Sequence, residues 1–124
     1  MIGYTLGEAG WEFAAGWVRV FRWEPSKQWS KLGNDVYGTA AYDYSGASVA
    51  ASNDGNTIAV GTPESDRSKL NLGHAFVYYW NSTLGSWIQK GNKLIGVNAS
   101  QDLFGEAISI SDDGNVVAVA GRNI

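Results

Sequence analysis

The chain contains the same pattern of residues twice, and this repeat constrains its fold more than any other feature. Residues 43–61 return as residues 102–120, a shift of 59 positions. Upstream of them, residues 16–23 return as residues 73–80, a shift of 57 positions. Each copy consists of short alternating segments separated by turn residues. A repeat of this length indicates that one supersecondary unit is built more than once.

The first half of each repeat predicts two strands joined by a tight turn. Ile108 and Ile110 alternate with small residues, which is the period-two signal of a strand. An Asp-Gly pair follows in both copies and favours a hairpin, because glycine adopts positive φ at no steric cost. The segment after the turn is rich in β-branched residues, as in a strand buried on both faces. We expect strands at 47–52, 57–61, 106–111 and 116–121, with turns at 53–56 and 112–115.

The other half of each repeat predicts two further strands. Residues 17–23 and 74–80 alternate between small or β-branched side chains on one face and mainly aromatic side chains on the other. The fourth strand of each repeat is expected at 29–38 and 87–96. No window shows the apolar spacing of a helix, so the predicted fold class is all-β.

The order of these strands predicts a circularly shifted arrangement. Residues 2–3 align with residues 60–61, so the chain enters at the end of a second strand. It then continues with strands three, four, one, two, three, four, one and two. Repeated four-stranded units of this kind are typical of β-propeller blades. We expect a single two-blade unit over residues 1–124, with repeat 1 at about 2–60 and repeat 2 at about 61–121.

Only the middle blade is complete in sequence, and this predicts assembly of several chains. Two-stranded fragments are marginal in water and leave edges that invite pairing. The last two strands of one chain are expected to complete a blade with the first two strands of the next. Because each chain supplies two four-stranded blades, we expect a homo-oligomeric ring of three or four chains.

Composition excludes several classes of partner. The net charge is −3 and there is no basic cluster, so the chain lacks the electrostatic footprint of a nucleic-acid ligand. It has no cysteine, hence no disulfide framework and no thiolate chemistry. No apolar run approaches the length of a membrane span, and residues 1–8 lack the basic start and apolar stretch of a signal peptide. We expect no nucleic-acid partner and no membrane insertion.

Several segments resemble the FG-GAP, or integrin-alpha-like, β-propeller repeats of cell-surface and secreted proteins. The resemblance rests on Asp-Leu-Phe-Gly at 102–105, on Ser-Asp-Asp-Gly-Asn at 111–115, on Val-Gly-Thr-Pro at 60–63 and on the Gly-x-Val-x-Val-Phe segment at 16–21. It spans about residues 2–121, almost the whole chain. It implies a β-propeller fold, a non-enzymatic binding role and an extracellular or cell-surface location.

The chain departs from the family pattern at three points. Ser45 stands where the family has Phe. The integrin-type calcium loop is missing, because such a loop needs several carboxylates and carbonyls at alternating positions, and only short turns at 53–56 and 112–115 occupy this place. The chain also carries two repeats where closed rings of the family have about seven. We therefore interpret the two Asp-Gly segments as hairpin turns.

The residues give no constellation for catalysis. The only histidine, His74, occupies the position of Trp17 in the other repeat, at a strand start, which favours a packing role. No serine lies in a nucleophile elbow. No histidine or cysteine spacing suggests zinc, and no glycine-rich loop opens a helix to hold phosphate. We expect no enzymatic activity, no metal and no cofactor.

Paired tryptophans recur in the two copies. Trp23 and Trp29 return as Trp80 and Trp87, and such pairs resemble a bacterial and algal subgroup of the family. Because a repeat conserves what its architecture needs, the pairs are interpreted as packing between blades.

Four other residues are the candidates for ligand binding: Trp11, Glu12, Trp17 and His74. Aromatic side chains bind sugars and cations, and a loop residue that the repeat does not require is a better functional candidate. Trp11 and Glu12 lie in such a loop, whose counterpart at 65–69 is polar. Each has a structural alternative: Trp11 covers a neighbouring blade, Glu12 is solvated loop charge, and Trp17 and His74 are packing residues.

Three hypotheses for function follow. The first is a non-enzymatic binding or adhesion module whose ligand is a glycan or a protein. The alternative is a structural fragment of a longer FG-GAP-like propeller with no independent activity. The third is an enzyme assembled across subunits, for which the sequence offers no residues.

Overall fold

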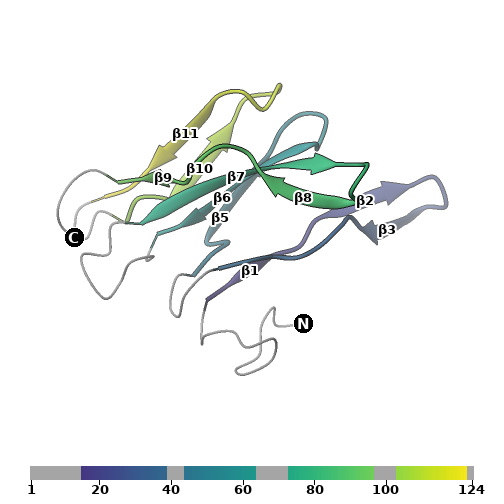
Figure 1. Ribbon diagram of the computed structural model, residues 1–124, viewed down its shortest axis with the longest axis horizontal. Helices are drawn as coiled ribbons and strands as arrows, with labels where there is room; N and C mark the ends of the chain where they lie inside the picture. Colours follow the sequence, from purple (N-terminus) through teal and green to yellow (C-terminus); the bar gives the residue numbers. More distant parts are fainter. Residues whose placement is uncertain (1–14, 39–43, 64–72, 97–102, 123–124) are drawn as a thin grey trace.

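The computed structural model describes residues 15–38, 44–63, 73–96 and 103–122. All the secondary-structure elements in these segments are β-strands, which confirms the predicted all-β class (Figure 1). The strands form a central sheet, an interrupted hairpin before it in sequence and a second hairpin after it.

The middle of the chain forms a five-stranded antiparallel sheet, here called the central sheet. Its order is β5-β6-β7-β8, and β9 pairs with β7 beyond β8. β8 and β9 are therefore two pieces of the predicted fourth strand. Each strand lies beside its neighbour in sequence, as a meander does. The strands are β5 (Ser48–Ala51), β6 (Thr57–Thr62), β7 (His74–Asn81), β8 (Ser86–Gln89) and β9 (Leu94–Ile95).

Two-stranded hairpins flank the central sheet in sequence. In the N-terminal hairpin β1 pairs with β4 and β2 with β3, and in the C-terminal hairpin β10 pairs with β11, all antiparallel. The strands are β1 (Trp17–Val18), β2 (Phe21–Glu24), β3 (Gln28–Lys31), β4 (Val36–Tyr37), β10 (Ala107–Ile110) and β11 (Val117–Ala120).

The N-terminal hairpin differs from the sequence prediction, because its two strands are interrupted. Residues 19–20 separate β1 from β2, and residues 32–35 separate β3 from β4. Gly33 has a φ of 75°, which breaks the regular ladder at this point. The backbone N–H of Leu32 still donates to the carbonyl of Val20 at 2.8 Å. The hairpin is therefore held together across the interruption.

The predicted Asp-Gly turns are present in both repeats. Asp54 Oδ1 accepts hydrogen bonds from the Ser52 hydroxyl at 2.8 Å and from the Asn56 N–H at 2.9 Å. The second turn repeats these contacts around Asp113. Gly55 has a φ of 73°, which a side chain with a Cβ rarely adopts. The local sequence alone is sufficient to specify these hairpins.

Strand β6 is buried along its whole length because the two hairpins cover its opposite faces. On one face Ile58 and Val60 form a core with Val36 of β4 and Trp87 of β8. On the other face, β10 lies against β5 and β6, and the space beside the Gly61 Cα is filled by the carbonyl of Gly105. In Figure 1 the two hairpins lie on opposite sides of the central sheet.

Candidate functional site

The structure places two of the four candidate binding residues. Trp11 and Glu12 lie outside the described residues. Trp17 and His74 begin β1 and β7, so they hold the same position in two different units. Both are half-buried, Trp17 opposite Tyr37 and His74 opposite Ile95. Their binding role stays a prediction.

The two positions have different chemical surroundings. The Arg19 guanidinium lies 4.8 Å from the centre of the Trp17 ring, which is a cation–π arrangement. The His74 ring instead contacts Phe76 edge-on, with 6.3 Å between ring centres. The His74 carbonyl accepts a hydrogen bond from the Thr62 hydroxyl at 3.0 Å. Trp17 thus lies in a charged environment and His74 at the end of an aromatic row.

The sequence reasoning missed a charged cluster beside Trp17. Arg19 donates through Nε and Nη2 to both carboxylate oxygens of Asp35, each at 2.8 Å. Lys31 Nζ lies 3.3 Å from the same carboxylate, whose side chain is only 7% exposed. A bidentate arginine–carboxylate pair is both strong and directional. The cluster therefore fixes the position of the strand segment that carries Trp17.

A weak signal for this cluster is present in the sequence. Arg19 and Asp35 lie directly beside the paired ends of β1 and β4, yet their counterparts in the other repeat are Phe76 and Lys93. Opposite charges that appear in one repeat only, on positions that face each other, point to a contact specific to that repeat. Recognising it requires the strand register, which the interruptions of the N-terminal hairpin obscure.

The Asp35 carboxylate is expected to make stability depend on pH. The hydrogen bonds from Arg19, helped by Lys31, lower the pKa of Asp35 from 3.8 to about 2. Because the folded state holds this proton less tightly than the unfolded chain, the stabilisation is complete above about pH 4 and is lost as pH falls towards 2. Asp35→Asn should lower the free energy of unfolding at pH 7 by about 1–2 kcal/mol and flatten its fall between pH 4 and 2.5. Urea titrations at these pH values measure both effects.

The matched control is the exposed ion pair of Arg122 with Glu106, 2.8 Å apart. Solvent screens exposed pairs, so Glu106→Gln should change the free energy of unfolding by less than about 0.5 kcal/mol. Equal losses in the two variants at pH 7 would contradict the role given to Asp35.

The carboxylates of Asp54 and Asp113 accept hydrogen bonds from groups within their own turns. Hydrogen bonds from the backbone N–H of Asn56 and the hydroxyl of Ser52 lower the pKa of Asp54. The hydroxyl of Ser111 and the N–H of Asn115 lower the pKa of Asp113 in the same way. The described segments contain no group of three or more acidic or histidine residues that could hold a metal ion. Because of these hydrogen bonds, we interpret Asp54 and Asp113 as residues that stabilise the turns.

Two pairs of tryptophans, at equivalent positions of the two repeats, contact each other across neighbouring strands. The ring centres of Trp80 and Trp87 are 5.4 Å apart, and Trp87 is only 4% exposed. Its indole Nε1 donates to the Leu32 carbonyl at 2.9 Å, and its backbone N–H donates to the Asn34 side chain at 2.8 Å. This pair therefore joins the central sheet to the N-terminal hairpin, in agreement with the packing role predicted from the repeat.

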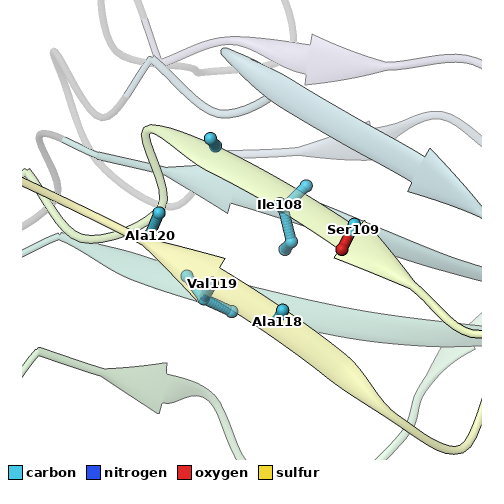
Figure 2. A pocket seen from close by; sticks show the side chains of 6 residues that line it. Ile108, Ser109, Ala118, Val119 and Ala120 are labelled. Carbon is cyan, nitrogen blue, oxygen red and sulfur yellow. The ribbon is translucent and has the colours of Figure 1, made fainter.

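The C-terminal hairpin carries a shallow hollow of about 240 Å³. Figure 2 shows the side chains of β10 and β11 that line it, among them Ser109, Ala118 and Ala120. Its lining has one hydroxyl and no charge. A hollow of this kind accepts a small apolar group, and offers no arrangement of groups for acid–base chemistry.

Comparison with known proteins identifies one repeat. The model of the FG-GAP repeat matches residues 37–78, from the end of β4 through β5 and β6 into β7. No curated protein matches the chain. Such repeats form β-propeller-type, adhesion-like modules that are generally non-enzymatic and typical of extracellular proteins. No helix in the described segments has the length and apolarity needed to cross a membrane.

Proposed function

Because residues 37–78 match the model of the FG-GAP repeat, we propose that the protein is a non-enzymatic β-propeller module for binding or adhesion, assembled as a homo-oligomeric ring. The observation that carries this proposal is the coincidence of the repeat with a meander in which β5, β6, β7 and β8 follow one another. A glycan or a protein is the proposed ligand, and an extracellular or cell-surface setting is the proposed location.

The two-stranded hairpins at either end of the central sheet support the assembly. The N-terminal hairpin supplies the third and fourth strands of a blade, and the C-terminal hairpin supplies the first and second. A ring of three chains contains six blades and a ring of four contains eight. Light scattering on a sizing column should therefore give three or four times the 13.3 kDa of one chain.

The alternative is a structural segment of a longer FG-GAP-like propeller with no activity of its own. In that case the blades adjoining the two hairpins belong to the same polypeptide. A peak at 13.3 kDa, or a heterogeneous smear, favours this alternative over the ring.

The proposed ligand site comprises Trp11, Glu12, Trp17 and His74. Loops and strand ends that recur around a ring present the same weak site several times, and repeated sites gain affinity through avidity. Of the two members that the structure describes, Trp17 has its ring 4.8 Å from the Arg19 guanidinium and pairs with Tyr37 across the strands. Indole rings provide a flat apolar surface with a polar edge, which suits a sugar ring.

Ligand binding is expected to change the tryptophan fluorescence, and Trp11→Ala is expected to abolish that change. The probes are neutral and acidic oligosaccharides titrated into the assembled protein. Trp80→Phe is the control, because it removes a tryptophan outside the proposed site and keeps an aromatic ring in the internal contact with Trp87. A response that survives Trp11→Ala removes Trp11 from the site, and the absence of any response to the panel leaves a protein ligand as the remaining proposal.

A further inference from the structure

Repeat-related tryptophans differ sharply in exposure. Trp87 is 4% exposed because it packs against residues 32–34 of the preceding unit. Its counterpart Trp29 is 63% exposed, and Trp23, the counterpart of Trp80, is 53% exposed. The two rings of the exposed pair nevertheless contact each other, with 5.1 Å between ring centres. The N-terminal hairpin thus presents an assembled copy of a packing surface to solvent.

The surface that receives the tryptophans is also present twice. Gly33 has a φ of 75°, and a Cβ built there meets the Trp80 ring at 2.5 Å. Its counterpart Gly91 has a φ of 76°, and nothing lies within 4 Å of the same point. A nearby apolar residue shows the same difference between the repeats: Val36 is 6% exposed, whereas its counterpart Leu94 is 37% exposed. Within the described segments, the chain therefore carries one exposed tryptophan pair and one unfilled place that matches it.

We propose that Trp23 and Trp29 of one copy dock on the loop at residues 90–92 of a second copy, while β11 of that second copy adds to the edge of β1 and β2 of the first copy that no strand among the described residues occupies. The proposal rests on the ring assembly proposed above and names its interface. Both surfaces belong to this chain, so the occupant is a second copy. Because the two surfaces differ, the contact is head-to-tail and propagates around a ring.

The internal pairing of β6 with β7 predicts the register of the added strand. Inside the central sheet Ala59 pairs with Val77 and Ile58 pairs with Tyr78. Applying the shifts of the repeat, Ala118 of the second copy should pair with Val20 of the first copy, and Val117 of the second copy with Phe21 of the first. By the same correspondence, the Trp29 indole N–H should donate to the Lys90 carbonyl, as Trp87 does to Leu32.

One further exposed residue fits the same interface. Val49 is 54% exposed, whereas its counterpart Ile108 lies in the hairpin that covers β5 and β6. The repeat correspondence places Val49 of the first copy against the hollow on β10 and β11 of the second copy. Figure 2 shows the residues that line this hollow. One position departs from the internal pattern: Ala120 stands where Gly61 admits the Gly105 carbonyl. The first copy must therefore lie slightly farther from β11 of the second copy than β10 lies from β6.

The first test places a side chain in the vacant position. Gly91→Asn introduces a side chain on a residue type that tolerates positive φ. The new side chain should occupy the space that the incoming tryptophan needs. Gly85→Asn is the matched control, because Gly85 also has a positive φ, 66°, and nothing within 4 Å, but lies at the tip of the β7–β8 hairpin. We expect Gly91→Asn to raise the dissociation constant of the assembly about tenfold or more, and Gly85→Asn to leave the molar mass unchanged. Near-ultraviolet circular dichroism of the buried tryptophan pair verifies that both variants are folded.

The second test measures the register in which β11 of one copy pairs with β1 and β2 of the other. The chain has no cysteine, so Val20→Cys with Ala118→Cys should form disulfides between copies and give a closed covalent multimer on a non-reducing gel. Directly opposed residues of an antiparallel pair are within disulfide range. The control Val20→Cys with Val119→Cys is slipped by one residue, places the thiols on opposite faces and should stay uncrosslinked.

The outcomes separate this interface from the ring itself. A ring that tolerates Gly91→Asn and crosslinks only in the control register overturns the interface and leaves the assembly standing. A wild-type protein that is monomeric at all concentrations overturns both. A ring that dissociates with Gly91→Asn and crosslinks through Val20 and Ala118 supports the interface, whether or not a glycan is found to bind.

Discussion

Trp87→Ala is expected to lower the free energy of unfolding by about 3–5 kcal/mol, the range for truncating a buried tryptophan. The side chain is 4% exposed and packs with Ile58, Val60 and Val36. Its loss leaves a cavity between the central sheet and the N-terminal hairpin, and removes the donor to the Leu32 carbonyl. Chemical denaturation followed by far-ultraviolet circular dichroism measures the change.

The same substitution in the other repeat provides the control. Trp29 is 63% exposed within one chain, so Trp29→Ala should have little effect on an isolated chain. Its effect should increase with protein concentration, because ligand or subunit binding stabilises by mass action. The loss caused by Trp87→Ala should persist at every concentration. Two variants with the same concentration-independent loss would show that the two tryptophans have equivalent surroundings and would contradict this structure.

Gly61→Ala is expected to cost about 3 kcal/mol through overpacking. An added Cβ would overlap the Gly105 carbonyl oxygen and the Ser48 hydroxyl, and the first of these belongs to backbone that cannot rotate away. The C-terminal hairpin must move away from β6 to make room, which also weakens the hydrogen bond from Ser48 Oγ to Gly105, now 2.8 Å. Thermal and urea unfolding of the purified variant measure the loss.

The chain itself supplies the control for this substitution. Ala120 is the repeat counterpart of Gly61 and already carries the methyl group. Ala120→Gly removes the methyl from a strand and should cost no more than about 1 kcal/mol, the usual penalty of glycine flexibility. If Gly61→Ala and Ala120→Gly lower the free energy of unfolding by equal amounts, the C-terminal hairpin does not pack closely against Gly61 in solution.

Sequence reasoning identified the positions of the strands because local chemistry decides them. The Asp-Gly turns at 53–56 and 112–115 carry their own hydrogen-bond donors and a glycine for positive φ. The alternation of residues 74–80 agrees with a strand at His74–Asn81, one residue longer. The interruption of the N-terminal hairpin at residues 32–35 was missed, because it depends on a glycine that also packs against Trp80 from another unit.

The candidate site was only partly predictable. A residue's place in a repeat identifies Trp17 and His74 as counterparts, and the structure finds both at strand starts. The Arg19–Asp35 pair was missed because the two residues are far apart in sequence and meet only through the pairing of β1 with β4. The binding roles predicted for Trp11, Glu12, Trp17 and His74 stay predictions.

The sequence by itself determined the all-β class, the turns and the order of the strands, because periodicity, turn chemistry and the repeat act over a few residues. Only the tertiary structure decided which of two identical-looking residues is buried. Trp87 and Trp29, and likewise Gly33 and Gly91, occupy equivalent positions in the repeat but have different neighbours. Burial depends on what packs against a side chain, and the repeat alone cannot show where a chain has a neighbouring unit and where it lacks one.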